Sequence, residues 1–243
     1  MPRLRLAAIA TMALFVSATA SAAPLSGHFT IAGLGDVRVG PNFIDWGQTG
    51  NIFGPTNGDI LFVSGTGSFS GLPLTQGTIK DLTSPPDTVG TPLTVNNFLT
   101  SNAQPTWNFQ LNFIQPGSGT AAGCTNVVGD VCTPFVGSPF TITNLAGGGS
   151  TVGLSLNGTL TDGIGPASAF VGTFTTQFAN LTAADILALI ATQGFVQSSH
   201  SAEFNATVGE QVIPEPATLL LFGTGLSLIS AGVARRRNKK RAA

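Results

Sequence analysis

The sequence has few charged residues and no tyrosine. Among its 243 residues, 10 are Lys or Arg and 11 are Asp or Glu, so only 9% carry a charge. Typical soluble proteins carry roughly 25%. Disordered chains of high charge also have little apolar content, whereas 42% of this sequence is apolar. The composition therefore excludes a charged, disordered chain and favours a folded one.

Basic residues are almost absent from the central part of the chain. Between residues 24 and 213 only Arg38 and Lys80 are basic, whereas ten residues are acidic, which gives this part a net charge of −8. A protein that binds nucleic acid needs a patch of Lys and Arg side chains against the phosphates. Two cations cannot form such a patch, so the sequence predicts that no nucleic acid is a partner.

Residues that commonly perform catalysis or bind metals are also scarce. The two histidines are His28 and His200, and neither has a second ligand at the spacing of a zinc site. No Gly-x-Ser-x-Gly elbow precedes a helix, and no close pair of carboxylates indicates glycoside hydrolysis. We therefore expect no metal, no cofactor and no catalytic residue. We also expect His200 on the surface, because it lies in the polar run Gln197–Ser201.

Residues 1–22 have the three parts of a secretory signal peptide. Arg3 and Arg5 supply positive charge, an apolar stretch of 11 residues follows at 6–16, and small residues at 20–22 form a cleavage site. We expect signal peptidase to cleave at the end of this segment, which exports the rest of the chain.

The two cysteines, Cys124 and Cys132, lie in one loop region between Pro116 and Pro134. Export to an oxidising compartment favours a disulfide between them, with free thiols as the alternative. A metal pair is disfavoured because no histidine or second cysteine pair lies nearby. A redox-active pair usually has two intervening residues, whereas this pair has seven.

A second uncharged apolar run lies near the C-terminus. As an α-helix, residues 217–234 would extend about 27 Å, enough to cross the hydrocarbon core of a membrane. Six basic residues follow within 235–241, and such a cluster is typical of the cytoplasmic side. We therefore expect a transmembrane helix at 217–234, with the C-terminus in the cytoplasm.

The tripeptide Pro214-Glu215-Pro216 stands directly before this run. Its two prolines keep the backbone extended, as a protease substrate requires. A Pro-Glu-Pro tripeptide, an apolar helix and a basic cluster in this order resemble the PEP-CTERM sorting signal of Gram-negative bacteria, here over residues 212–241.

The resemblance implies a processing partner and a destination. In this family an exosortase, an integral-membrane cysteine protease or transpeptidase-like enzyme, processes the C-terminal tail. Pro214, Glu215 and Pro216 match the residues that it recognises. The substrates accompany exopolysaccharide and biofilm production. The resemblance therefore implies a protein that is held briefly in the inner membrane and then reaches the cell surface or the extracellular space, with exopolysaccharide as a further partner.

Residues 23–211 form the expected exported domain, and their apolar side chains alternate with period two. This alternation is typical of strands with one buried face, and Gly, Pro, Asn and Asp interrupt it every 8 to 15 residues. We interpret the pattern as an antiparallel sandwich or barrel, and expect mainly a β-sandwich. The expected inward residues are Phe29, Ile31, Leu61, Val63, Trp107, Phe109, Leu111, Phe113, Phe140, Ile142, Val152, Leu154, Leu156, Leu160, Phe170, Phe174, Phe178, Phe204, Ala206 and Val208. Asn157-Gly158 is interpreted as a turn signal within this pattern.

One segment of the domain departs from the strand pattern. Thr182 can cap a helix, Asp185 stands at the third helical position, and Gly194 can end the helix. We expect one short helix near 183–193, with an apolar face that covers one edge or end of the sheets.

These features favour an exported, non-enzymatic protein of the cell surface or extracellular matrix. A carbohydrate-binding module is the first alternative, because Trp46 adjoins turn residues and could stack on a sugar from an exposed position, whereas Trp107 fits a core position. A secreted hydrolase is the weaker alternative, since the residues of a hydrolytic triad are present but no motif brings them together.

Overall fold

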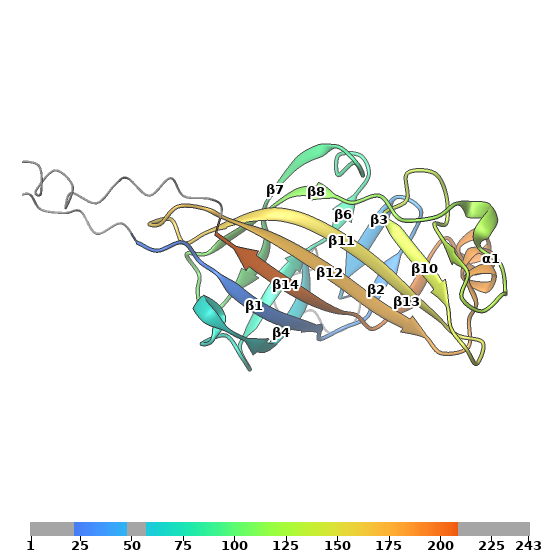
Figure 1. Cartoon of the computed structure of the whole chain (residues 1–243), viewed down its shortest axis with the longest axis horizontal. Coiled ribbons are helices and arrows are strands. Elements are labelled where there is room, and N and C mark those ends of the chain that lie inside the picture. Colours follow the sequence, from blue (N-terminus) through green and yellow to red (C-terminus); the bar gives the residue numbers. More distant parts are fainter. Residues whose placement is uncertain (1–21, 48–56, 209–243) are drawn as a thin grey trace, which may run out of the picture. The chain divides into compact units, whose positions relative to one another are not determined.

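The computed structural model of the chain describes residues 22–47 and 57–208. The chain divides into two units, Met1–Gly209 and Glu210–Ala243, and every described residue belongs to the first. The predicted signal peptide, apart from Ala22, and the predicted sorting signal lie outside the described residues. The described part is mostly antiparallel β structure with one α-helix, which confirms the predicted fold class (Figure 1).

The main sheet of the described part has ten strands, and eight of them form a closed ring. The ring closes because β12 pairs with β14 on one side and with β11 on the other. In ring order the strands are β12 (Ser168–Phe178), β14 (Ser201–Thr207), β1 (Gly27–Gly33), β4 (Asn57–Gly65), β5 (Gln76–Lys80), β7 (Pro92–Ser101), β8 (Asn108–Ile114) and β11 (Ser150–Thr161). Each strand of the ring therefore has a neighbour on both sides. The two layers of the predicted sandwich are parts of one continuous, closed sheet.

Further strands and short helical segments surround this ring. β10 (Phe140–Asn144) and β9 (Val131–Cys132) extend the main sheet beyond β11. A small sheet of four strands has the order β13 (Val196–Ser198), β2 (Val37–Val39), β3 (Phe43–Trp46) and β6 (Leu82–Thr83). The remaining elements are the 3-10 helices η1 (Gly67–Phe69) and η2 (Ala121–Gly123) and the α-helix α1 (Ala183–Gln193).

The ring has two different ends. β1 begins and β14 ends at the same end, because Gly27 pairs with Ala206 in their antiparallel register. We name this the terminal end, since the described chain enters and leaves there (Figure 1). α1 and β10 lie at the opposite end, which we name the distal end (Figure 1).

Phenylalanine rings fill the core. Phe29 is fully buried and stacks on Phe204 with ring centroids 4.8 Å apart and an interplanar angle of 5°. The rings of Phe62, Phe69 and Phe109 lie 5.6, 4.8 and 5.6 Å from that of Phe29. Phenylalanine has no polar atom that needs a partner, so this core imposes no hydrogen-bonding demand on its surroundings.

The burial of β8 follows the sequence prediction until a bulge intervenes. Trp107, Phe109 and Leu111 are buried, as predicted. The pairing with β11 shifts by one residue near Asn157, so Ile114 rather than Phe113 becomes the next buried residue. An extra residue in one strand reverses the faces beyond it, and a pattern of strict alternation cannot show this.

Two further predictions for strand residues are wrong. In β4 the buried apolar side chains are Ile60 and Phe62, whereas the predicted Leu61 is only partly buried and Val63 is 51% exposed. Apolar residues occupy both alternating positions of this strand, so its period-two pattern was ambiguous. Val208, predicted to point inward, is 45% exposed because β14 ends at the preceding residue.

The predicted turn at Asn157-Gly158 is also wrong, because β11 continues through it. A Cβ at Gly158 would lie 2.3 Å from Cζ of Phe170. This glycine therefore makes room for a core ring on the neighbouring strand, and it does not form a turn.

The predicted helix is confirmed as α1. The hydroxyl of Thr182 accepts a hydrogen bond from the backbone N–H of Asp185, and the Asp185 carboxylate accepts one from the backbone N–H of Thr182. Gly194 ends the helix in a left-handed conformation with φ of 82°. Ile186 is buried against Ile142 and Val196, so the helix covers apolar residues of both sheets, as expected.

Replacing Phe29 with Ala should destabilise the domain by about 3–5 kcal/mol, because the change leaves a cavity among four neighbouring rings. Urea unfolding of the full chain measures this free energy. Val63→Ala is the control on the adjacent strand and should cost less than about 1 kcal/mol, because Val63 is half exposed. Equal losses in the two variants would contradict the assignment of Phe29 to the centre of the core.

Candidate functional sites

Trp46, the candidate for stacking on a sugar, is buried. Its side chain is 2% exposed and packs against the rings of Phe174 and His200, each with centroids 4.8 Å away. Gly58 permits this position, since a Cβ there would lie 2.4 Å from Cβ of Trp46. The prediction that Trp46 is exposed is therefore wrong, and its ring presents no free face to a glycan in this structure.

His200 was predicted on the surface but is only 7% exposed. Its imidazole lies over Gly33, where a Cβ would come within 2.2 Å of Cε1. The polar sequence around His200 misled the prediction, because the space for its ring is created by a glycine that is distant in sequence. Burial lowers the pKa of His200 to about 4, although the negative charge of Asp36 opposes this shift. The ring is therefore neutral near pH 7.

Asp81 contacts the same region through a hydrogen bond to the backbone of Trp46 in β3. Its Oδ1 accepts a hydrogen bond of 2.8 Å from the backbone N–H of Trp46. Burial raises the pKa of Asp81 to about 6; this hydrogen bond opposes the rise and the nearby charge of Asp45 adds to it. A carboxyl group with this pKa changes its charge under mildly acidic conditions.

This region does not assemble a hydrolytic triad within the described residues. A catalytic histidine needs hydrogen bonds to a nucleophile and to an orienting acid, whereas neither ring nitrogen of His200 has a partner in the described part. The same residues contain no group of three or more His, Cys, Asp or Glu side chains placed to hold a metal ion.

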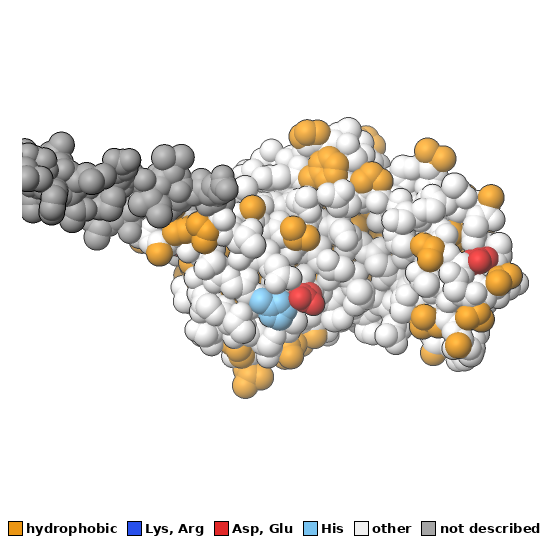
Figure 2. Space-filling view, viewed as in Figure 1, with side chains coloured by type: hydrophobic (Ala, Val, Ile, Leu, Met, Phe, Trp, Pro, Cys, Tyr) orange, Lys and Arg blue, Asp and Glu red, His pale blue; other side chains and the backbone are white. Residues whose placement is uncertain are grey.

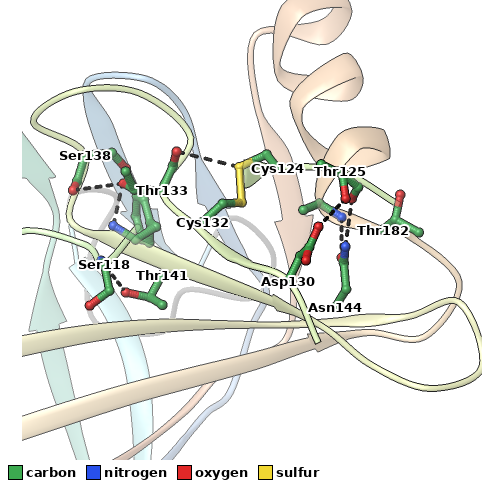
Figure 3. Close-up of a disulfide and its surroundings, with 12 residues drawn as sticks. Ser118, Cys124, Thr125, Asp130, Cys132, Thr133, Ser138, Thr141, Asn144 and Thr182 are labelled. Atoms are coloured by element: carbon green, nitrogen blue, oxygen red, sulfur yellow. Dashed lines mark hydrogen bonds between the residues drawn. A yellow bond between two sulfur atoms is a disulfide. The ribbon is translucent and has the colours of Figure 1, made fainter. Parts of the chain in front are cut away.

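The predicted disulfide joins Cys124 and Cys132 with an S–S distance of 2.02 Å (Figure 3). Cys132 is fully buried in β9 and belongs to the same apolar cluster as Ile142 and Ile186. The disulfide therefore attaches the loop at 125–130 to the distal end of the domain.

Asn144 links this loop to the helix, and no sequence signal had indicated it (Figure 3). Its Nδ2 donates to the backbone oxygens of Thr125 and Val127 at 2.7 and 3.0 Å. Its Oδ1 accepts from the backbone N–H of Ala183 at 2.8 Å, at the start of α1. One buried carboxamide thus satisfies backbone groups of two segments that are distant in sequence.

The residues of the predicted sorting signal, Pro214, Glu215 and Pro216, lie outside the described residues, and so does the predicted span 217–234. Within residues 22–47 and 57–208 there is no helix with the length and apolar character needed to cross a bilayer.

Comparison with known proteins identifies the C-terminal segment. Residues 212–238 match the family model of the PEP-CTERM protein-sorting motif. No curated protein and no solved structure matches the chain.

The chain therefore carries a C-terminal sorting signal of an exported protein. The signal is of the PEP-CTERM type, which confirms the predicted resemblance and implies export, processing by an exosortase and sorting to the surface or extracellular space.

The low pKa of His200 predicts a loss of stability in acid. Between pH 6.5 and about 4 the unfolded chain binds a proton that the folded chain excludes. The contribution of His200 to stability should therefore fall by about 3 kcal/mol as the pH drops through this range. Asp81 acts in the opposite direction, because its pKa is raised from 3.8 to about 6 in the folded chain, which then binds the extra proton.

Urea unfolding of the Asp81→Asn variant between pH 4 and 7 isolates the effect of His200, since an asparagine Oδ1 can still accept from Trp46. In the Asp81→Asn background, the additional substitution His200→Gln should abolish the loss of unfolding free energy between pH 7 and 4. Adding His28→Gln, which removes the other histidine, should leave the loss in place. An unchanged loss without His200 would assign it to another group.

Proposed function

We propose that this protein is a non-enzymatic component of the cell surface or extracellular matrix, delivered there by exosortase processing. The PEP-CTERM motif at 212–238 is the observation that carries the proposal. It supports an exported, exosortase-sorted protein. The matrix role and the absence of enzymatic activity go beyond it and rest on the chemistry of the folded domain.

The position of the motif along the chain suits processing after the domain has folded. The last strand of the described residues, β14, ends at Thr207, and the segment that matches the motif begins at residue 212. Pro214 is the seventh residue after Thr207, and an extended chain of this length reaches at most about 25 Å. In our proposal the apolar run at 217–234 holds the precursor in the inner membrane with its C-terminus in the cytoplasm, and a membrane enzyme cleaves near the motif.

The outer surface of the domain suits contact with a hydrated polymer. The outward residues Thr173 and Thr175 of β12 and Asn205 of β14 are exposed. Figure 2 shows few charged side chains on the visible face. Hydroxyl and amide groups can exchange hydrogen bonds with a polysaccharide without a requirement for charge. This surface supports our proposal that exopolysaccharide is a partner in a matrix or biofilm.

The two alternative functions have less support. A carbohydrate-binding module that uses Trp46 as a stacking platform would need an exposed ring, and this ring is buried. A hydrolase that uses His200 would need a nucleophile beside it, and His200 has no hydrogen-bond partner in the described part. A non-enzymatic matrix role requires neither feature.

The Glu215→Ala variant tests the sorting step. It should accumulate as an unprocessed, membrane-held precursor in the producing bacterium, because it lacks the charged residue of the recognition tripeptide. Fractionation and intact mass of the membrane-bound and released forms measure the outcome. Glu210→Ala is the matched control, since it removes the same charge two residues before the matched segment begins at residue 212, outside the tripeptide. Normal maturation of Glu215→Ala would contradict the role assigned to the tripeptide.

A further inference from the structure

A groove of about 230 Å³ lies beside β6, the strand at one edge of the small sheet. Its lining also includes residues of β3, the end of β8 at Ile114, and the loop at 133–139 that precedes β10. A water molecule occupies about 30 Å³ in the liquid, so the groove has room for a small organic molecule. Its surface is polar as well as apolar, so polar groups of the lining face the open space.

The lining combines aromatic rings with one negative charge. Phe43, Phe135 and Phe140 contribute the rings, and Asp87 is the one charged residue among the described residues of the lining. Phe43 and Phe135 are half-buried, so part of each side chain remains accessible to a ligand. Phe140 is only 8% exposed and belongs to the main core, as does Ile114. The apolar wall of the groove is therefore continuous with the packed core.

Two hydrogen bonds to Thr83 hold Asp87 beside β6. Oδ2 of Asp87 accepts from the backbone N–H of Thr83 at 2.9 Å, and the backbone N–H of Asp87 donates to the carbonyl oxygen of Thr83 at 2.8 Å. Thr83 itself lies in β6 and lines the groove. The negative charge therefore has a defined position at the groove.

The ring of Phe43 is positioned by a tight turn. A Cβ at Gly40 would lie 2.2 Å from Cε1 of Phe43, so the ring packs over the glycine. The backbone N–H of Gly40 donates to the carbonyl oxygen of Phe43 at 3.0 Å and closes the turn. Both residues line the groove. The placement of this ring is thus built into the turn that begins β3.

The charges of the groove and of the domain select a cation as the ligand. The described residues include nine acidic and two basic side chains, and such an excess attracts cations and repels anions. A metal ion needs several oxygen ligands, whereas no three acidic, His or Cys side chains of the described part are grouped to hold one. Aromatic ring faces attract alkylated ammonium groups, so an organic cation suits this lining.

The other cavity of the domain lacks these features. An apolar cavity of about 50 Å³ lies between the main sheet, the small sheet and α1, and Trp46 and His200 are among its lining residues. Almost none of its surface is polar, and its volume equals that of about two water molecules. It is therefore too small for an organic ligand, whereas the groove is large enough.

We propose that the groove binds a small organic cation that carries an alkylated ammonium group. The ammonium group lies against the rings of Phe43 and Phe135, and the carboxylate of Asp87 balances its charge. A fully alkylated nitrogen has no N–H that needs a hydrogen-bond partner, so it can contact the apolar wall without a desolvated donor. This binding goes beyond the proposed matrix role and does not depend on it.

Amide NMR of the full chain in a neutral maltoside detergent tests the proposal, with choline as the probe. Choline should shift the backbone amide resonances of Thr83 and Gly137, which line the groove, in a saturable way. Neohexyl alcohol has nearly the same shape but a carbon atom in place of the charged nitrogen. It should bind roughly tenfold more weakly, because the attraction to the rings and to the carboxylate is lost.

Asp87→Asn and Asp162→Asn form a matched pair of variants. Each removes one negative charge and keeps an oxygen that can accept from the backbone, since Asp87 accepts from Thr83 and Asp162 accepts from Ile164 and Gly165. Asp162 does not line the groove. Asp87→Asn should weaken choline binding about three- to fivefold and leave neohexyl alcohol binding unchanged. Asp162→Asn should change neither affinity.

Phe135→Leu tests the aromatic contribution. It keeps an apolar side chain in the groove but removes the ring face, and should weaken choline binding roughly two- to fivefold. Unchanged amide resonances in β14, which contributes no residue to the groove, show that each variant is folded.

Three results would overturn the proposal. The first is a folded chain that gives no saturable shift with choline. The second is equal affinity for choline and neohexyl alcohol, which indicates an apolar groove without preference for charge. The third is an equal loss of affinity in the two aspartate variants, which assigns the attraction to the net charge of the domain and not to Asp87.

Discussion

The closure of the main sheet through β12 is the constraint on which the rest of the structure depends. Eleven residue pairs join β12 to β11 and seven join it to β14. Closure gives every strand of the ring two neighbours, so no strand of the ring needs charged side chains to protect a sheet edge. It also creates one interior, where the largest fully buried side chains are phenylalanines, which need no hydrogen-bond partner. A chain with 9% charged residues can fold stably in this way.

A closed ring still has two ends, and this protein uses them differently. The terminal end receives and releases the chain, and it leads toward the segment that contains the sorting motif. The distal end carries the disulfide between Cys124 and Cys132, the helix α1 and the carboxamide of Asn144, which connects them. Between the distal strands, α1 and the small sheet lies the apolar cavity with Trp46 and His200.

The sequence predicted those features whose signals are local. The helix at 183–193 was recognisable because its capping residues stand next to it, and the strand-rich fold was recognisable from alternation. Features that depend on distant residues were not predictable. Gly158 looks like a turn residue until Phe170 is placed beside it, and His200 looks like a surface residue until Gly33 makes room for its ring. The role of Asn144 likewise arises from two segments that only the fold brings together. The sorting motif could be identified from sequence because it is defined by the order of three short segments along the chain, namely the Pro-Glu-Pro tripeptide, the apolar run and the basic cluster, and not by a fold.

The central claim is that an all-β domain reaches the cell exterior by means of two removable segments, one at each terminus. Intact mass spectrometry of the form isolated from the surface or medium of the producing bacterium tests this claim most directly. The account predicts that the N-terminus begins at Ala23, that the basic tail at 235–241 is missing, and that reduction adds the mass of two hydrogens for one disulfide. A surface form that retains both residues 1–22 and the basic tail would contradict the account.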